Sequence, residues 1–211
     1  MQNVVPAVEA SLTSQAATRS LADRRAVYEH EVQALVDATY VVMRQTGSIE
    51  PRVSDIVHRA GLSNQAFYRH FRSKDELLLA VLDDGQRRLV GYLEHRMAGT
   101  HDPLQQVRRW VEGVMEQARN PGAAANTRPF ALHASRLADQ FPDETAHSRE
   151  LLVAPLRDAI TAAGGDARRD ADAVYHLTMG AMHDALVRSV TPSKRDVEHL
   201  VQFTLGGLSG A

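Results

Sequence analysis

The stretch Arg52–Leu78 reads RVSDIVHRAGLSNQAFYRHFRSKDELL and decides the fold. Its first half places apolar residues at helical spacing, which predicts one short helix. The break that follows contains Gly61, which can adopt a left-handed conformation without a side-chain clash and so can end that helix. Ser63 is placed to cap a second helix over residues 64–71. Two helices joined by a glycine-containing turn predict a helix-turn-helix.

The second of these helices has an apolar side and a polar side. Phe67 and Phe71 lie four residues apart and can pack back on the first helix. From residue 51 to residue 74 there are five basic residues and one acidic residue, although the whole chain has a net charge of −2. A local basic face with interleaved aromatic residues fits a DNA phosphate backbone. The alternative is a small helical module with a solvated basic face.

The sequence of this region resembles the tetracycline-repressor (TetR-like) family of bacterial transcriptional regulators, from the first helix to the start of the fourth. The matching residues are Gly47, Val53, Asp55-Ile56, Ala60-Gly61-Leu62-Ser63, Phe67-Tyr68, His70-Phe71 and Ser73-Lys74-Asp75-Glu76-Leu77. The sequence departs from the family pattern at Ser48, where an aromatic residue is frequent, at Pro51, where threonine is usual, and at Arg69, where a second aromatic residue is usual. The resemblance implies an effector whose binding releases DNA.

Eight residues are candidates for contact with double-stranded DNA. We expect phosphate contacts from Tyr68, His70 and Lys74, with Lys74 aided by a helix N-terminus. Arg52 and Ser63 are further phosphate candidates. Asn64, Gln65 and Arg69 are placed for base edges, because Asn and Gln suit adenine and Arg suits guanine.

The composition bounds the class of protein. At 211 residues, the chain is long enough for one or two domains with a sizeable core. The absence of cysteine excludes a disulfide scaffold and fits a reducing cytoplasm, where we expect the protein to be located. The sequence shows neither a signal-peptide pattern nor an apolar run long enough for a membrane span. We therefore expect no membrane partner.

The periodicity predicts an all-α fold of about nine helices. It consists of an N-terminal three-helix helix-turn-helix head and a C-terminal helical ligand-binding and dimerisation domain. The predicted divisions are a flexible N-terminal arm over 1–20, a DNA-binding domain over 21–72 and an effector-binding and dimerisation domain over 73–211. The first helix is expected from about Ala22. The fourth, from Ser73 to about Met97, is predicted to join the two domains, with Gly85 and Gly91 as points where it could bend.

The C-terminal domain offers candidates for a ligand pocket, since aromatic and methionine side chains with a few polar groups suit a small, largely apolar molecule. These are Trp110, Met115, Phe130, His133, Phe141, Met179, Met182 and His183. The same residues at helical spacing also suit an ordinary core. Asp172, His176 and His183 lie on one helix face, but nothing else completes a metal site. We predict no catalytic residue, no metal and no cofactor.

The last two helices are predicted to form a homodimer, because the first of them is apolar on more than one face. The expected interface residues are Val174, Tyr175, Thr178, Ala181, Met182, Ala185, Val197, Leu200, Val201, Thr204 and Leu208. The sequence thus predicts a non-enzymatic regulator that represses a palindromic operator and is released by a small effector. The alternatives are a helical sensor or interaction protein without specific DNA binding, and a metal-binding protein.

Overall fold

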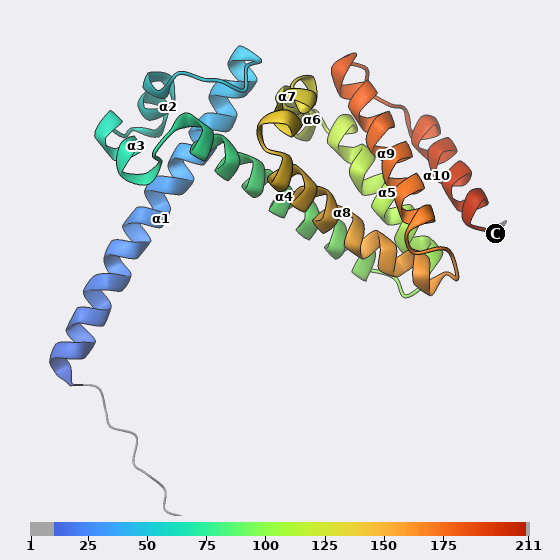
Figure 1. Cartoon of the computed structure of the whole chain (residues 1–211), viewed down its shortest axis with the longest axis horizontal. Helices are drawn as coiled ribbons and strands as arrows, with labels where there is room; N and C mark the ends of the chain where they lie inside the picture. Colours follow the sequence, from blue (N-terminus) through green and yellow to red (C-terminus); the bar gives the residue numbers. More distant parts are fainter. Residues whose placement is uncertain (1–10, 210–211) are drawn as a thin grey trace, which may run out of the picture.

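A computed structural model describes residues 11–209, which form ten helices and no strand within that range (Figure 1). The helices are α1 (Leu12–Thr46), α2 (Val53–Ala60), α3 (Asn64–His70), α4 (Lys74–Ala98), α5 (Pro103–Arg119), α6 (Pro121–Leu132), α7 (Ala134–Gln140), α8 (Pro142–Ala162), α9 (Arg169–Val187) and α10 (Lys194–Ser209). The all-α prediction is confirmed.

The head is built from α1, α2 and α3. Gly47 has a φ of 68° and ends α1, and its amide donates to the carbonyl of Met43 at 2.8 Å. After this turn the chain runs back to α2 and α3, which lie beside the second half of α1 (Figure 1) and pack against it and against each other. Leu35 of α1, Ile56 of α2 and Phe67 of α3 are almost fully buried where these helices meet. Their burial sets the orientation of α3 relative to α1.

The apolar cluster of the head continues beyond the predicted boundary at residue 72. It includes Leu77 and Val81 from the first turns of α4, and Leu137 and Phe141 from α7 and the residue that follows it. A hydrogen bond also joins the two parts, since the hydroxyl of Tyr40 on α1 donates to the carbonyl of Val81 on α4 at 2.8 Å. Head and body therefore share packed side chains and are not joined by a linker alone.

The body is organised around α5, which packs against α4, α6, α8, α9 and α10. Trp110 lies at its centre with 0% of its surface exposed. Its indole Nε1 donates to the carbonyl of Leu152 on α8 at 3.0 Å, and its ring contacts Tyr175 on α9. A tryptophan packs well in a core when its N–H finds a partner, as this one does. α9 and α10 lie at the end of the body away from the head (Figure 1).

Two segments differ from the sequence prediction. Residues 12–20 belong to α1, so the predicted arm over 1–20 is wrong for this part, while residues 1–10 lie outside the described range. The alanine-rich segment after Asn120 forms the separate helix α6, which accounts for ten helices in place of about nine. Its start is specified locally, because the Asn120 side chain accepts hydrogen bonds from the amides of Gly122 and Ala123.

Candidate nucleic-acid interface and ligand cavity

The start of α3 has the geometry that the sequence predicts. Gly61 has a φ of 68°, in the left-handed region that favours glycine. Two residues on, the hydroxyl of Ser63 accepts a hydrogen bond from the amide of Ala66 at 3.1 Å and caps the helix. Phe67 and Phe71 are buried on the inner side of α3. Together, these contacts fix which side of the helix faces outward.

The outer side of α3 carries polar side chains. Asn64 and Gln65 are exposed in its first turn, and Tyr68 has 62% of its surface exposed. Lys74, the first residue of α4, is also exposed, and Ser73 caps α4 by accepting from the amide of Glu76 at 3.1 Å. Helix N-termini attract anions, because their first amides are not used within the helix. This face thus combines groups suited to phosphates with groups suited to base edges.

Arg52 and Ser63 stand at the edges of this face. Arg52 is exposed and precedes the first residue of α2, without a capping hydrogen bond from its side chain. Pro51, which stands where the family pattern has threonine, is buried and lies before the helix. The hydroxyl oxygen of Ser63 accepts the capping hydrogen bond of α3, which leaves its O–H able to donate to a phosphate.

Arg69 and His70 point toward α1. The guanidinium of Arg69 lies 2.5 Å from a carboxylate oxygen of Glu31 and over the ring of Tyr28, 5.5 Å from its centroid. Nε2 of His70 lies 2.5 Å from the same oxygen, and only 6% of the His70 side chain is exposed. The side chains predicted to reach DNA at these positions thus bind α1 within this structure. Sequence spacing could not reveal the partner, because Glu31 is 38 residues from Arg69.

Glu31 holds the last turn of α3 through these contacts. Hydrogen bonds from His70 and then from Arg69 lower the pKa of its carboxyl group below the ordinary value of 4.5. A carboxylate with a lowered folded-state pKa stabilises the fold above its unfolded-state pKa, and this contribution is lost as pH falls through the folded-state pKa. The contacts of Glu31 with Arg69 and His70 therefore stabilise the position of α3 at neutral pH.

We expect Glu31→Gln to lower the free energy of unfolding at pH 7, and we expect the difference from the wild type to shrink as pH falls below 4.5. Denaturant titrations at a series of pH values measure this. Glu29→Gln is the control, because Glu29 is exposed and its ion pair, with Arg25, lies one turn away on the same helix. A difference that does not change with pH would mean that the charge of Glu31 does not stabilise α3.

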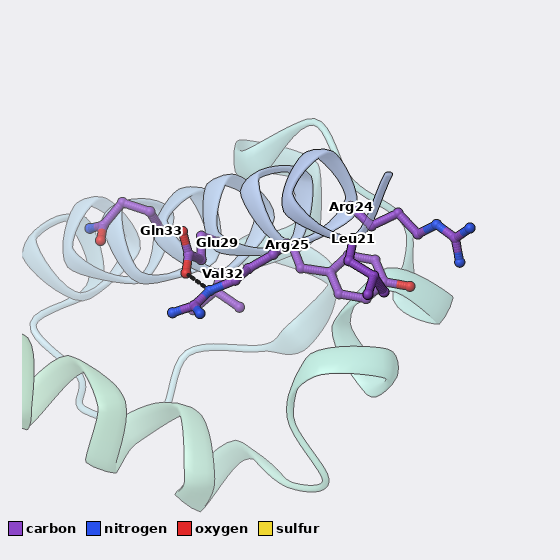
Figure 2. Close-up of a pocket in the computed structure, with 7 residues that line it drawn as sticks. Leu21, Arg24, Arg25, Glu29, Val32 and Gln33 are labelled. Carbon is purple, nitrogen blue, oxygen red and sulfur yellow. Dashed lines mark hydrogen bonds and ion pairs between the residues drawn. The ribbon is translucent and has the colours of Figure 1, made fainter. Parts of the chain in front are cut away.

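The first half of α1 extends away from the head (Figure 1), and residues 18–30 are exposed. Figure 2 shows a shallow groove along this helix, with the Arg25–Glu29 ion pair beside Leu21 and Arg24. All residues that line this groove lie on α1 itself. It is therefore an open helix face with mixed charge and two exposed apolar side chains, Leu21 and Tyr28.

A cavity of about 610 Å³ lies where the head meets the body, and we call it the junction cavity. Of the predicted ligand residues, Phe130, Met179 and Met182 line it. A second hollow of about 460 Å³ adjoins it and includes Phe130 and Phe141 in its wall. Sequence reasoning did not identify the contribution of α1, which provides Tyr40 to the junction cavity, because no local pattern records that α1 faces α6.

Four predicted ligand residues lie elsewhere. Trp110 is inside the core of the body, and Met115 is buried beside the outer groove between α9 and α10. His133 lies between α6 and α7, where its amide donates to the carbonyl of Phe130 at 3.2 Å. His183 is exposed on α9. These residues serve the core, a helix junction and the surface.

Seven of the eleven predicted dimer residues are buried inside the chain itself, so they are not free to meet a second copy. The buried members are Val174, Thr178, Met182, Ala185, Val197, Val201 and Thr204. Tyr175, Ala181, Leu200 and Leu208 are partly buried against the same cluster. α9 is apolar on more than one side, and the side that the prediction turned outward faces α5. In α9, α10 and the turn between them, the large apolar residues that are exposed are Leu177, Val187, Val190 and Phe203.

The histidines and acids of α9 do not converge. Asp172 pairs with Arg149 at 2.7 Å, and His176 and His183 are exposed. Among residues 11–209, no three histidine, aspartate or glutamate side chains lie close enough together to hold a metal ion. Within the same range, no helix has the length and apolar character needed to cross a membrane.

Several solved structures share this fold. A putative TetR-family transcriptional regulator from Mesorhizobium loti MAFF303099 superposes with a TM-score of 0.67 at 18% identity, covering 86% of this chain and 96% of its own. A putative TetR-family transcriptional regulator from a Rhodococcus species gives a TM-score of 0.68 at 20% identity, covering 85% and 97%. The fold is thus shared over most of the chain, while little sequence is shared with these two proteins.

The fold and the exposed face of α3 define a helix-turn-helix head. Residues 35–81 match the model of the bacterial regulatory proteins of the tetR family. The HTH-type transcriptional regulator BetI of Yersinia pestis (strain Pestoides F) is 30% identical over 97 residues, which cover 45% of this chain and 49% of BetI. This chain thus spans about half the length of the curated relatives it matches. The match to the tetR family thus covers the second half of α1, α2, α3 and the first turns of α4.

Proposed function

We propose that this protein represses transcription by occupying a palindromic DNA operator as a homodimer, and that a small, largely apolar effector releases it. The observation that carries the proposal is the outer face of α3 and the start of α4, where Asn64, Gln65, Tyr68 and Lys74 are exposed. The opposite side of α3 is held in place by buried aromatic side chains. Base-edge and phosphate contacts need such side chains on a helix whose orientation is fixed.

The structure modifies the roles we propose within this face. Asn64 and Gln65 are the proposed readers of base edges, and Tyr68 and Lys74 the proposed phosphate contacts, with Arg52 beside them. Arg69 can reach DNA only after it leaves Glu31, so its contribution carries the cost of breaking that pair. We assign His70 to the packing of α3 on α1, because its side chain is almost fully buried.

Protection of DNA by the purified protein tests the proposal. The DNA upstream of its own gene is one substrate, and a scrambled fragment of equal length is the control. We expect a symmetric protected site on the first and none on the second. Equal binding to both fragments would contradict the proposal and favour the alternative, a helical protein without specific DNA binding.

Lys74→Ala is expected to weaken binding to operator and scrambled DNA alike. Lys74 contributes charge to a phosphate, so its loss should reduce the slope of log affinity against log salt by about 1 per half-site. Anisotropy titrations at several salt concentrations measure this. Gln65→Ala is the matched variant, and it should leave the salt slope almost unchanged while relaxing the preference at one symmetric base pair. The reverse pattern would mean that we have assigned the recognition face wrongly.

The dimer is proposed to form through the outer groove between α9 and α10. Its walls include Leu177 and Ala181 on α9 and Leu200 and Phe203 on α10. Leu177 and Phe203 are exposed apolar residues. The helices that carry them, α9 and α10, lie at the end of the body away from the head (Figure 1). Two copies that meet here through a twofold axis would cover these side chains and leave both heads free to contact DNA.

Phe203→Glu is expected to convert the dimer into a monomer, because a carboxylate would be buried in an apolar interface. Sedimentation at micromolar concentration measures the change. Leu21→Glu is the control, since Leu21 is 65% exposed on α1 and Phe203 is 66% exposed on α10. A Phe203→Glu variant that stays dimeric, or a wild type that is monomeric, contradicts the proposed interface.

A further inference from the structure

The junction cavity has walls from both parts of the molecule. α1 contributes Tyr40 and Val41 from the head, and α6 contributes Phe130 and Asn126 from the body. Tyr40 and Phe130 meet edge to face with ring centroids 6.3 Å apart. A molecule in this cavity therefore touches the DNA-binding head directly and does not depend on α4 alone to transmit its presence.

Most of the cavity wall is apolar. Leu89 of α4, Leu152 of α8 and Met179 of α9 line it together with the two aromatic residues described above. Methionine and aromatic side chains adapt to an apolar guest and gain contact area when it enters. Most of the surface of a suitable ligand is consequently aliphatic or aromatic.

One polar atom in the wall lacks a partner. Oδ1 of Asn126 is buried and has no hydrogen-bond partner among residues 11–209. The hydroxyl of its neighbour Thr127 donates to Oε1 of Gln117 at 3.4 Å and therefore not to Asn126. Buried acceptors are rarely left without a donor. A ligand with one N–H or O–H group would supply the donor that the protein does not.

The charged groups at the cavity are largely paired with one another. Arg88 lies 2.9 Å from a carboxylate oxygen of Asp84 and 3.4 Å from one of Asp37. Arg44 is the remaining charged lining residue, and it is exposed to solvent. An ionic ligand would have to lose its hydration without gaining an inward-facing counter-ion. This arrangement favours an uncharged ligand.

We propose that the junction cavity binds an uncharged, mostly apolar molecule with one hydrogen-bond donor, held by Asn126, and that this ligand acts on the head through Tyr40. Its effect on DNA rests on the proposed repressor function, whereas the binding itself does not. A ligand changes the position of the head only by binding one head–body arrangement better than the other. Contact with α1 provides that difference.

The test uses a matched set of probes on the full chain without DNA. N-phenyl-1-naphthylamine is neutral and has one N–H, 1-anilinonaphthalene-8-sulfonate adds a negative charge to the same skeleton, and 1-phenoxynaphthalene replaces the N–H with an ether oxygen. Trp110 is the only tryptophan of the chain and bonds to Leu152 in the cavity wall, so a naphthylamine bound in the cavity must receive energy transfer from it, and the Asn126 variant below tests the location.

We expect the neutral amine to bind with energy transfer from Trp110, and the sulfonate and the ether each to bind about tenfold more weakly. Asn126→Leu should remove the preference for the amine over the ether. Gln105→Leu, on the exposed side of α5, should retain it. A sulfonate that binds as tightly as the amine, binding without energy transfer, or a preference that survives in Asn126→Leu would each overturn the proposal.

Operator titrations with and without the amine separate this inference from the proposed function. If the protein binds the amine as expected but no operator, the repressor proposal fails and the binding site stands. If it binds an operator but not the amine, the function stands and the ligand assignment fails. If the amine binds and operator affinity does not change, the action through Tyr40 is refuted.

Discussion

Trp110→Ala is expected to lower the free energy of unfolding by about 3–5 kcal/mol, the usual cost of truncating a large aromatic residue in a core. Trp110 has no exposed surface, its ring packs beside Tyr175, and its N–H is satisfied by the carbonyl of Leu152. Alanine would leave a cavity among α5, α8 and α9. Urea denaturation followed by circular dichroism measures the loss.

Trp110→Phe is the graded control. It keeps an aromatic ring in the core but removes the N–H that reaches Leu152, so its cost should fall clearly below that of alanine. Equal losses for the two variants would mean that the hydrogen bond and not the packed ring stabilises the body. A loss below about 1 kcal/mol for Trp110→Ala would place this residue outside the core, since buried aromatic truncations cost several times more.

Gly85→Ala and Gly91→Ala are expected to have opposite effects on stability. A methyl group at Gly85 would lie 2.7 Å from the hydroxyl of Tyr40, whereas a methyl group at Gly91 would have no atom within 4 Å beyond its own chain neighbours and the nearby backbone of α4. Alanine at Gly91 should therefore stabilise α4 by up to about 1 kcal/mol through helix propensity. Alanine at Gly85 should overpack the junction and destabilise the protein by about 1–3 kcal/mol.

Tyr40→Phe in the Gly85→Ala background identifies the cause. Removing the hydroxyl removes the clash, so the double variant should recover most of the stability lost in Gly85→Ala. Tyr40→Phe alone should cost about 1 kcal/mol, because it loses the hydrogen bond to Val81. The double-mutant cycle gives the coupling free energy, and a value near zero would show that the two residues do not contact each other.

The same pair of glycines shows what sequence reasoning could not separate. From the sequence, Gly85 and Gly91 are equivalent weak points in one helix. The structure distinguishes them by Tyr40, which lies 45 residues before Gly85 and packs against α4 only because α1 is oriented by the head core. Contacts between distant segments depend on this packing, and helical periodicity does not encode them.

Sequence signals predict the structure correctly where neighbouring residues provide the hydrogen bonds that end or begin a helix. Gly61 and Ser63 ended one helix and began the next as their chemistry predicts. The two faces of α9 were not distinguished, because both are apolar and only the position of α5 decides which is covered. The pairing of Glu31 with Arg69 and His70 was missed for the same reason, since the acid lies on a different helix.

The first half of α1 has a consequence for how the molecule opens. Residues 18–30 are exposed, and Tyr28, near the end of this segment, contacts Arg69 and His70 of α3. A helix segment with few contacts to other helices gains little beyond its own backbone bonds. We expect amide hydrogens before Glu31 to exchange within the earliest time points, while those near Leu35 exchange only when the head unfolds. Trypsin should accordingly cut at Arg19, Arg24 and Arg25 and leave a resistant fragment. α1 is therefore one continuous helix whose two halves differ in local stability, with the boundary where Glu31 contacts α3.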